Sequence, residues 1–377
     1  MKIYYWSPFT SNVATIKAVI NSAYGLKKIF KFNTYIINSF GEWNGYKKEI
    51  KSKKIKIINN PKNSKIVYTQ GYLKSRIAFI RIFFHSFFFL KNILLQNRPE
   101  FLVVHLITSL PLILFRLFKF ETKLVLRISG QPKLNYFRRL IWKISRQNIY
   151  CVTVPTKETL NFLKKMNIFD PSIIHYLPDP VFINKEINKY LKMKNKNNSK
   201  YIINIGRLTR QKNQKILIKS FKEISKNYKN LKLLILGKGE KYFELSNLVK
   251  QLNLENKVNF LGQVNSPYKY IKNSLCVIVS SLWEDPGFVM IESSALKKVV
   301  ISSDCQSGPK EFFNRGKTGF LFKNNNEKSL INAFEKFMNS SSVKISQNLN
   351  KNYIKSQEYS EIYHSKIFKK ILEHEKK

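Results

Sequence analysis

Two carboxylates in the C-terminal half of the sequence have a spacing suited to binding a sugar. Glu284 and Glu292 are separated by seven residues, which include the turn-forming pair Pro286 and Gly287. The run follows a β-branched stretch and leads into apolar residues of helical length, which predicts a strand, a tight turn and a helix start. Backbone N–H groups at such a helix start attract anions, and carboxylates beside them suit hydroxyl groups. We therefore hypothesise a nucleotide-sugar pocket; the alternative is that Glu284 is only a favourable charge at the helix dipole.

Two cations follow a second strand-like run at residues 201–205. Arg207 comes directly after Gly206, and Lys212 lies five residues beyond Arg207. A guanidinium offers a planar fork and an ammonium offers a point charge, and both suit a diphosphate. Each charge-assisted hydrogen bond contributes roughly 1.5–3 kcal/mol. Such a pair can therefore supply much of the affinity for a nucleotide donor.

Four motifs in a fixed order carry a resemblance over roughly residues 200–325. They are Gly-Arg-Leu at 206–208 with Lys212, Leu-Gly-Lys-Gly at 236–239, Phe-Leu-Gly-Gln-Val at 260–264, and Glu-x7-Glu at 284–292 followed by Ser-Gly-Pro-Lys-Glu at 307–311. The sequence resembles family 4 glycosyltransferases of the GT-B fold, and most of all the bacterial members that build lipopolysaccharide, O-antigen and lipid-linked glycans. The resemblance implies an α/β fold with two doubly wound, Rossmann-like domains facing across a cleft.

The resemblance also implies roles for the site residues. Arg207 and Lys212 would hold the diphosphate and stabilise it as it leaves, which makes a metal unnecessary. Glu284 would approach the transferred sugar and Glu292 would bind the ribose hydroxyls. The implied catalytic residues are Glu284, Arg207, Lys212 and His105, and the implied donor-binding residues are Gly206, Arg207, Lys212, Val264, Glu284, Gly287, Phe288, Val289 and Glu292.

Two departures from the family pattern stand out. The family's Glu-Gly-Phe-Gly-Leu becomes Glu-Asp-Pro-Gly-Phe at residues 284–288, so one of its glycines is kept. The first loop, at residues 7–12, lacks the glycines that the family carries there. The role of this loop, like the donor base, the sugar, the acceptor and the linkage, is not fixed by the sequence.

The implied activity is that of a retaining, metal-independent hexosyltransferase without a cofactor. It would move a sugar from a nucleotide-sugar donor to a lipid-linked or lipopolysaccharide-type acceptor at the cytoplasmic face of the membrane. A soluble relative of sucrose or glycogen synthases is the first alternative. A basic nucleic-acid-binding protein is the second, but no recognition helix or RNA-binding motif is evident and the basic residues form no single stripe.

The bulk composition is that of a globular protein with an unusual charge. The chain has 377 residues, enough for two domains, and 67 basic against 23 acidic side chains give a net charge of +44. Such a charge attracts polyanions or anionic lipid, and we expect an anionic membrane surface and no nucleic acid as partner. Cys151, Cys276 and Cys305 form no close pair, which indicates a reducing, cytoplasmic compartment. The N-terminus leads directly into a strand pattern, so we expect no signal peptide.

Alternating strand and helix patterns predict two doubly wound domains. We expect an acceptor-binding domain at residues 1–182, a polar linker at 183–200 and a nucleotide-sugar domain at 201–352. A tail at 353–377 would carry a helix at 361–373 that crosses back to the first domain. The largely polar segment at 339–351 is expected to separate that helix from the second domain.

Residues 72–95 are aromatic and basic. An arginine near the centre of a membrane span costs roughly 2.5–3.5 kcal/mol, so Arg81 argues against a span. A buried helix and a helix lying on the membrane surface both remain open. The basic residues expected to meet the acceptor or the membrane are Arg76, Arg81 and Arg127. His105, at the end of a buried strand, contacts the donor sugar or orients the acceptor if the resemblance holds, and is otherwise a structural hydrogen-bonding residue.

Overall fold

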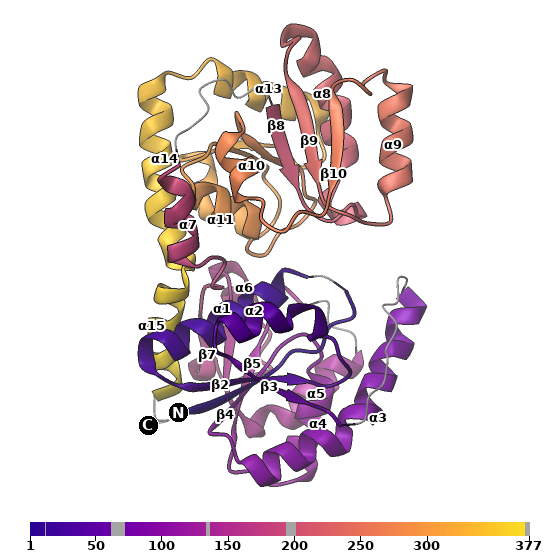
Figure 1. Cartoon of the computed structure of the whole chain (residues 1–377). Coiled ribbons are helices and arrows are strands. Elements are labelled where there is room, and N and C mark those ends of the chain that lie inside the picture. The colour runs from indigo at the N-terminus through magenta and orange to yellow at the C-terminus, as the bar shows by residue number, and fades with distance from the viewer. Residues whose placement is uncertain (12, 62–71, 133–135, 194–200, 374–377) are drawn as a thin grey trace. The chain divides into compact units, whose positions relative to one another are not determined.

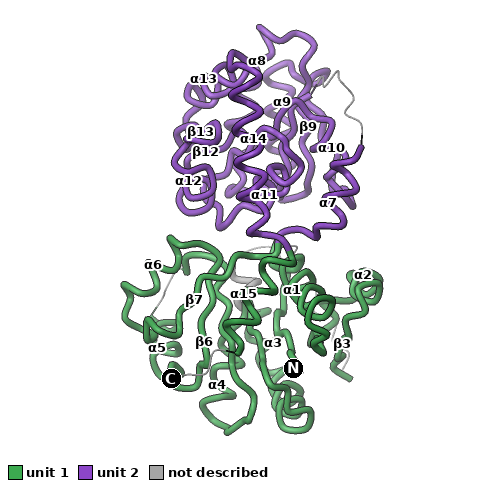
Figure 2. Tube along the Cα trace, turned by 90° about the vertical axis from the view of Figure 1, so that its left-hand side faces the viewer, with its two compact units in different colours: residues 1–180, 361–377 green, residues 181–360 purple. Residues whose placement is uncertain are grey.

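The chain folds into two compact units. The computed structural model describes residues 1–11, 13–61, 72–132, 136–193 and 201–373, with residues 72–76 described by their backbone alone. Unit 1 comprises residues 1–180 and 361–377, and unit 2 comprises residues 181–360 (Figure 2). The first unit therefore ends two residues before the expected boundary at residue 182, and the chain returns to it for the last helix.

Unit 1 is built on a parallel sheet, seven-stranded over the residues described above, in the order β3-β2-β1-β4-β5-β6-β7 (Figure 1). Its strands are β1 (Lys2–Trp6), β2 (Asn33–Asn38), β3 (Lys56–Asn59), β4 (Phe101–Val104), β5 (Lys123–Arg127), β6 (Ile149–Val154) and β7 (Ile174–Tyr176). The order reverses between β1 and β4. At such a switch point two loops diverge and leave room for a ligand beyond the carboxyl ends of the strands.

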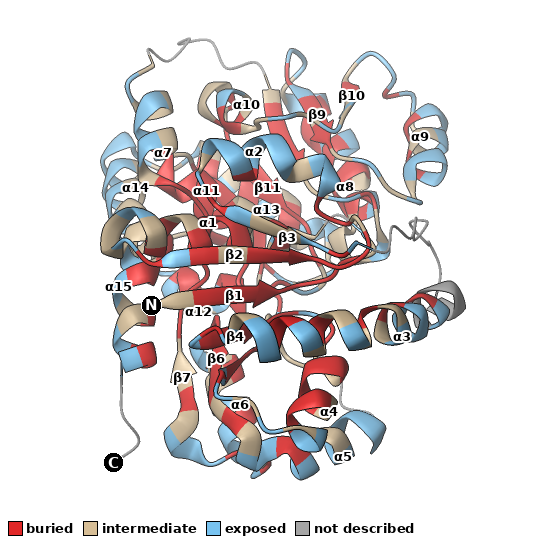
Figure 3. Ribbon diagram, turned by 60° about the horizontal axis from the view of Figure 1, so that its bottom comes forward, coloured by how far each residue is buried: buried red, intermediate tan, exposed pale blue. Residues whose placement is uncertain are grey.

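Helices cover the unit 1 sheet because its central strands are apolar on both faces. All four residues of β4 are buried, as expected for a parallel strand between two helical layers, and Figure 3 shows this buried centre in red. The helices are α1 (Ala14–Phe30), α2 (Lys47–Ser52), α3 (Tyr72–Asn97), α4 (Ser109–Leu117), α5 (Tyr136–Ser145), α6 (Lys157–Lys165) and α15 (Glu361–Glu373).

Helix α3 is partly a core helix. Leu90, Ile93 and Leu94 pack in the same apolar cluster as Trp6 of β1. The C-terminal half of α3 therefore packs against the sheet. By length and composition alone, the stretch Ile77–Asn97 could also cross a membrane. The buried-helix interpretation therefore holds for the second half of α3, while several apolar side chains of the first half are exposed.

The last helix is anchored to unit 1 by a buried histidine. Helix α15 packs against α1, and His364 Nδ1 lies 2.7 Å from the carbonyl oxygen of Pro178. Because a carbonyl only accepts, Nδ1 carries the proton, and Nε2 accepts from the Ser22 hydroxyl at 2.8 Å. Burial lowers the pKa of His364 to about 3, which keeps the ring neutral in this role.

Unit 2 holds a second parallel sheet, six-stranded within the part of the chain that the structure describes, in the order β10-β9-β8-β11-β12-β13. Its strands are β8 (Tyr201–Ile205), β9 (Lys232–Leu236), β10 (Val258–Gly262), β11 (Val277–Val279), β12 (Val300–Ser303) and β13 (Phe320–Phe322). The order reverses between β8 and β11, so the switch point of this unit lies between those two strands.

The helices of unit 2 differ from expectation in two places. The expected linker at 183–200 begins with α7 of unit 2, while residues 194–200 lie outside the described residues. The polar segment at 339–351 is largely α14, which packs against α11. The helices are α7 (Asn184–Leu191), α8 (Gln214–Asn227), α9 (Tyr242–Gln251), α10 (Tyr268–Asn273), α11 (Phe288–Ala295), α12 (Gly308–Phe312), α13 (Glu327–Met338) and α14 (Ser342–Ser356).

Candidate functional site

An ion pair lies at the switch point of unit 2. Lys212, on the loop after β8, donates from Nζ to Oε1 of Glu284, on the loop after β11. The side chains are only 19% and 9% exposed, so both charges are largely removed from water. The Ser281 hydroxyl also donates to Glu284 Oε1 at 2.6 Å. The structure thus joins a cation and a carboxylate that are 72 residues apart in the sequence.

The loop after β8 carries Arg207 and Lys212 together. Arg207 is exposed, and its Nη2 lies 3.4 Å from Oε1 of Gln211. Gln211 in turn donates from Nε2 to the carbonyl of Trp283 at 3.0 Å, and its own carbonyl accepts from Leu282 N at 2.8 Å. Gln211 therefore ties the cationic loop to the loop that carries the carboxylate.

Close packing of backbone fixes the loop that carries Glu284. Gly308 N donates to the Glu284 carbonyl at 3.1 Å, and a Cβ on Gly308 would lie 1.9 Å from the carbonyl oxygen of Pro286. Only glycine fits at that distance. Gly287 has a φ of 98° immediately before α11, a conformation that glycine adopts without the penalty a Cβ would bring. The predicted strand, turn and helix start is confirmed here.

Glu292 lies in the second turn of α11. Its carboxylate is 5% exposed, and Oε1 accepts from the hydroxyl of Tyr268 at 3.3 Å. Three residues expected near the donor, Val264, Phe288 and Val289, are partly buried against the same apolar cluster that contains Tyr268. The structure therefore groups Glu292 with an apolar wall at the carboxyl side of β10 and β11.

Cys305 lies beside the ion pair and is buried. Burial raises the pKa of its thiol to about 11, and the neighbouring Glu284 charge acts in the same direction. The thiol therefore stays neutral and is a small packing group against the loop of Glu284.

His105 follows β4 in unit 1 and is 4% exposed. Its Nδ1 has no hydrogen-bond partner among the described residues. Burial, followed by the charge of Arg127, lowers the pKa of His105 well below its usual value. The ring is neutral, so it can accept or donate a hydrogen bond but does not serve as a cation.

The three arginines expected at an acceptor or a membrane have different environments. Arg127 is buried, and it donates to Asp179 Oδ1 at 2.6 Å and to the Leu177 carbonyl at 2.7 Å. Both charges of this pair are enclosed in the protein, so Arg127 does not present its guanidinium to a membrane surface, and its expected place near the acceptor stays a prediction. Arg81 is exposed on α3, and the side chain of Arg76 lies outside the described residues.

A cavity of about 400 Å³ lies at the switch point of unit 1. It is bounded by the loop after β1, the loop after β4, and helices α3 and α5. Its wall is mostly apolar, with the Arg138 guanidinium as its one charged group among the residues the structure describes. The lining residues are Pro8, Phe9, Thr10, Ser11, Val13, Phe79, Leu106, Ile107, Thr108, Ser109, Arg138, Ile141 and Trp142.

A buried carboxylate supports one wall of this cavity. Glu42, in the turn after β2, accepts backbone N–H groups of Ser39 at 3.2 Å and Phe40 at 2.9 Å. Phe40 packs against Ile107, which lines the cavity. Burial raises the pKa of Glu42 to about 7. The Glu42 side chain thus stabilises the turn through hydrogen bonds to the backbone of Ser39 and Phe40.

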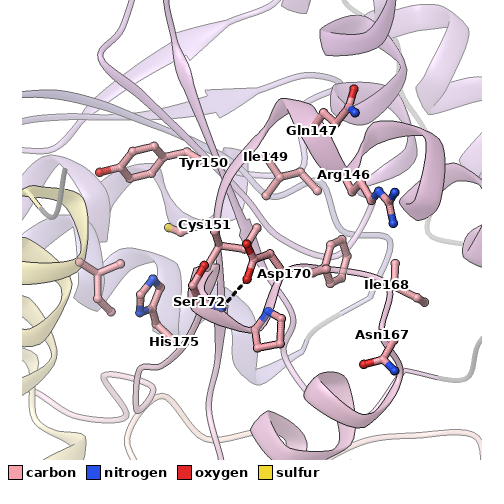
Figure 4. Close-up of a pocket in the computed structure, with 14 residues that line it drawn as sticks. Arg146, Gln147, Ile149, Tyr150, Cys151, Asn167, Ile168, Asp170, Ser172 and His175 are labelled. Carbon is pink, nitrogen blue, oxygen red and sulfur yellow. Dashed lines mark hydrogen bonds between the residues drawn. The ribbon is translucent and has the colours of Figure 1, made fainter. Parts of the chain in front are cut away.

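A larger cavity of about 670 Å³ opens at the other edge of the unit 1 sheet. Arg146, Asp170 and His175 contribute polar groups to its wall (Figure 4). Asp170 accepts from Ser172 N at 2.9 Å and so closes its own turn. The cavity lies at the amino ends of β6 and β7, whereas ligands of such sheets bind beyond the carboxyl ends.

Sequence reasoning missed the residues that hold the expected ones in place. Glu292 is contacted by Tyr268, and Glu284 is contacted by Ser281. Gln211 contacts the Trp283 carbonyl. Only Ser281 carries a local signal, because it lies three residues before Glu284. The other contacts join separate loops, and no spacing rule connects them.

Comparison with known proteins agrees with this geometry. Residues 186–356, nearly all of unit 2, match the family model of the glycosyl transferases group 1. The chain is 29% identical over 320 residues to an uncharacterized glycosyltransferase of Methanocaldococcus jannaschii, covering 79% of this chain and 75% of that protein. It is 28% identical over 250 residues to a Campylobacter jejuni enzyme, the N-acetylgalactosamine-N,N'-diacetylbacillosaminyl-diphospho-undecaprenol 4-alpha-N-acetylgalactosaminyltransferase, covering 63% of this chain and 64% of that enzyme.

Solved structures agree over nearly the whole chain. HepE of Anabaena in complex with UDP has a TM-score of 0.74 at 15% identity, with 99% of both chains covered. Sucrose-phosphate synthase of Thermosynechococcus elongatus has a TM-score of 0.75 at 14% identity, with 98% of both covered. The predicted α/β fold of the GT-B class is confirmed. The chain is therefore similar in fold to GT-B glycosyltransferases along its length, and its unit 2 matches the glycosyl transferases group 1 in sequence.

Proposed function

We propose that the protein is a retaining glycosyltransferase that moves a sugar from a nucleotide-diphosphate sugar to a lipid-linked or lipopolysaccharide-type glycan. The observation that carries the proposal is the buried pair of Lys212 and Glu284 at the β8/β11 switch point, with Arg207 on the same loop. Nucleotides bind at such positions in doubly wound sheets. The match of residues 186–356 to group 1 glycosyl transferases supports the same assignment.

Arg207 and Lys212 are assigned to the donor diphosphate. When the bond between the anomeric carbon and the diphosphate oxygen breaks, negative charge builds up on the leaving phosphate. Two fixed cations stabilise that charge more in the transition state than in the ground state. This chemistry needs no metal ion, and we propose a metal-independent reaction.

Glu284 is assigned to the transferred sugar and Glu292 to the ribose. Glu284 Oε1 already accepts hydrogen bonds from Lys212 and Ser281, which weakens that oxygen as a nucleophile and favours transfer without a glycosyl-enzyme intermediate. Glu292, oriented by Tyr268, suits a pair of hydroxyl groups. The apolar group of Val264, Phe288 and Val289 would border the base and the sugar.

The acceptor is assigned to the 400 Å³ cavity of unit 1. An apolar wall with one arginine suits a molecule that joins a hydrocarbon to a phosphate. The Campylobacter jejuni relative is named for a diphospho-undecaprenol acceptor, which supports this class. His105, neutral and with Nδ1 unpartnered among the described residues, lies next to the loop that lines the cavity and would bind a hydroxyl group there.

A soluble enzyme acting on a sugar or sugar phosphate is the second candidate. The likeness in fold to sucrose-phosphate synthase over 98% of both chains is what suggests this candidate. The two differ in the surface they need, because only a lipid-linked acceptor requires the enzyme at a membrane. We propose a cytoplasmic protein bound to the inner face of the membrane, with Arg81 on the exposed part of α3 facing lipid phosphates.

Release of nucleoside diphosphate from UDP-, GDP- and ADP-sugars, with a polyprenyl-diphosphate glycan as acceptor, tests the proposal. One donor should give turnover that falls by orders of magnitude in Glu284→Ala. Glu255→Ala, at an exposed position before β10, is the matched control and should keep most of the activity. Unchanged turnover in Glu284→Ala would refute the catalytic assignment, and turnover only with a free sugar phosphate would favour the second candidate.

A further inference from the structure

Helix α5 exposes an apolar stripe to solvent. Tyr136 is 76%, Phe137 72%, Leu140 43% and Ile144 51% exposed. Their spacing of three or four residues places Phe137, Leu140 and Ile144 on one side of the helix. Trp142 is 3% exposed and packs in the core of unit 1. The helix therefore has two apolar sides, and only one of them is covered by residues that the structure describes.

The exposed side of α5 is also basic. Arg139 and Lys143 are exposed beside the apolar stripe, and the sequence of α5 contains neither aspartate nor glutamate. A helix with apolar and aromatic residues bordered by lysine and arginine, and without acids, is the type that lies in the interface of an anionic bilayer. A protein partner would have to match the same arrangement with an acidic rim and an apolar groove.

A second stripe lies on α3. Ile77, Ile80, Phe84 and Phe88 are 53%, 60%, 72% and 67% exposed, and they recur at intervals of three or four residues along the helix. Arg81 is exposed near the stripe. The sequence of α3 likewise contains no acidic residue. Exposed apolar patches of this extent are unusual on a protein that meets only water.

The two stripes belong to one region of unit 1. Helix α4 packs against both α3 and α5 and lies between them in Figure 3. The cavity assigned to the acceptor is lined by Phe79 of α3 and by Arg138 and Ile141 of α5. The same two helices that expose apolar stripes thus also form walls of the cavity.

We propose that α5, together with the exposed stripe of α3, inserts into the interfacial layer of an anionic phospholipid bilayer, and that α5 is the main anchor. The proposal rests on the proposed function in one respect, namely that the acceptor reaches the cavity from the membrane. Phe137 and Ile144 would enter the acyl boundary, and Arg139 and Lys143 would meet phosphate groups. The bilayer then covers both stripes and brings a lipid-linked acceptor to the cavity between the two helices.

Sedimentation of the full chain with phosphatidylglycerol-containing vesicles tests the proposal, with pure phosphatidylcholine vesicles alongside. The double variant Phe137→Ser/Ile144→Ser should bind about a hundredfold more weakly, because each large apolar side chain lost removes about a factor of ten. Arg139→Gln/Lys143→Gln should lose the preference for anionic vesicles. The matched control is Phe243→Ser on α9 of unit 2, where Phe243 is 78% exposed, and it should bind as the unaltered protein does.

The same samples separate this proposal from the donor site. Thermal stabilisation by nucleoside diphosphates should be equal in all variants, because none of them touches the loops of Arg207 or Glu284. If the unaltered protein fails to bind anionic vesicles while nucleotides still stabilise it, the proposed membrane contact is refuted and the donor site is not affected. A loss of vesicle binding in Phe243→Ser as large as that in the α5 variant would also overturn it. So would an absence of vesicle binding together with a dimer in sedimentation velocity that Phe137→Ser abolishes.

Discussion

Replacing Glu284 with glutamine should tighten the binding of a free nucleoside diphosphate while it abolishes transfer. In the structure the Lys212 ammonium group forms an ion pair with the Glu284 carboxylate. A diphosphate therefore has to compete with that carboxylate for the ammonium group. Glu284→Gln removes the competing charge and leaves a side chain of nearly the same shape. Lys212 remains 19% exposed, enough for water to solvate it in the free variant.

The magnitude follows from the hydrogen bond that loses its charged acceptor. A hydrogen bond to a charged group contributes about 1.5–3 kcal/mol, and about 1.4 kcal/mol corresponds to a tenfold change in affinity. The glutamine amide oxygen can still accept from Lys212, so the lower end applies. The affinity for the free diphosphate should rise about tenfold.

Isothermal titration of both proteins with the nucleoside diphosphate that stabilises the chain most gives the two dissociation constants. Free diphosphate is used because it lacks the sugar that Glu284 is proposed to contact. An unchanged or weaker affinity in Glu284→Gln would refute the competition between the carboxylate and the phosphate. Lys212→Met is the converse variant and should lose at least a factor of about ten.

Lys212→Met also leaves the buried Glu284 carboxylate without its cationic partner. Breaking such a pair costs about 3–5 kcal/mol of stability. The double variant Lys212→Met/Glu284→Gln removes both charges and should recover most of that loss in urea unfolding. If the double variant is as unstable as Lys212→Met, the charge of Glu284 is not what destabilises the single variant.

Three further predictions concern residues around the two sites. Tyr268→Phe should raise the nucleotide dissociation constant several-fold, because Glu292 loses the hydroxyl that orients it, and binding equal to the unaltered protein would contradict this. Gly308→Ala should lower both the melting temperature and turnover, because its Cβ would lie 1.9 Å from the Pro286 carbonyl oxygen; full activity would show that the loop can move away. The carboxyl of Glu42 has a pKa raised from 4.5 to about 7 by burial, so its stabilising contribution is present below pH 4.5 and is lost as the pH rises through 7. At about 1.4 kcal/mol per unit, the free energy of unfolding should fall by about 3 kcal/mol between pH 4.5 and 8 relative to Glu42→Gln, and parallel pH profiles of the two proteins would contradict this.

The parts of the fold that could be predicted are those with a local signal. The strand predicted at 201–205 coincides with β8, because parallel strands buried on both faces read as short apolar runs. The helix predicted at 361–373 coincides with α15. The turn before α11 was likewise found because proline and glycine mark it directly.

Other parts depend on contacts that the sequence does not show. The polar segment at 339–351 is helical because Ser341 caps α14 by accepting from Lys344 N, and because Ile345 and Leu349 pack on the core of unit 2. Three apolar residues, Val343, Ile345 and Leu349, among ten polar ones give too weak a periodicity to predict a helix.

The candidate site shows the same division. Glu284 and Lys212 were chosen from separate motifs, and their ion pair could not be predicted because it joins loops 72 residues apart. Arg127 was expected near an acceptor or membrane because it ends a strand, just before a loop that lies on the acceptor side in the resembled family. It is instead paired with Asp179, and no spacing rule connects those two residues.

The structure of the protein with its nucleoside diphosphate bound tests the central claim most directly. The diphosphate oxygens should lie within hydrogen-bond distance, about 3 Å, of both Arg207 and Lys212, and the ribose hydroxyls should meet the Glu292 carboxylate. A nucleotide bound in unit 1, or one whose phosphates lie away from both cations, would contradict the account.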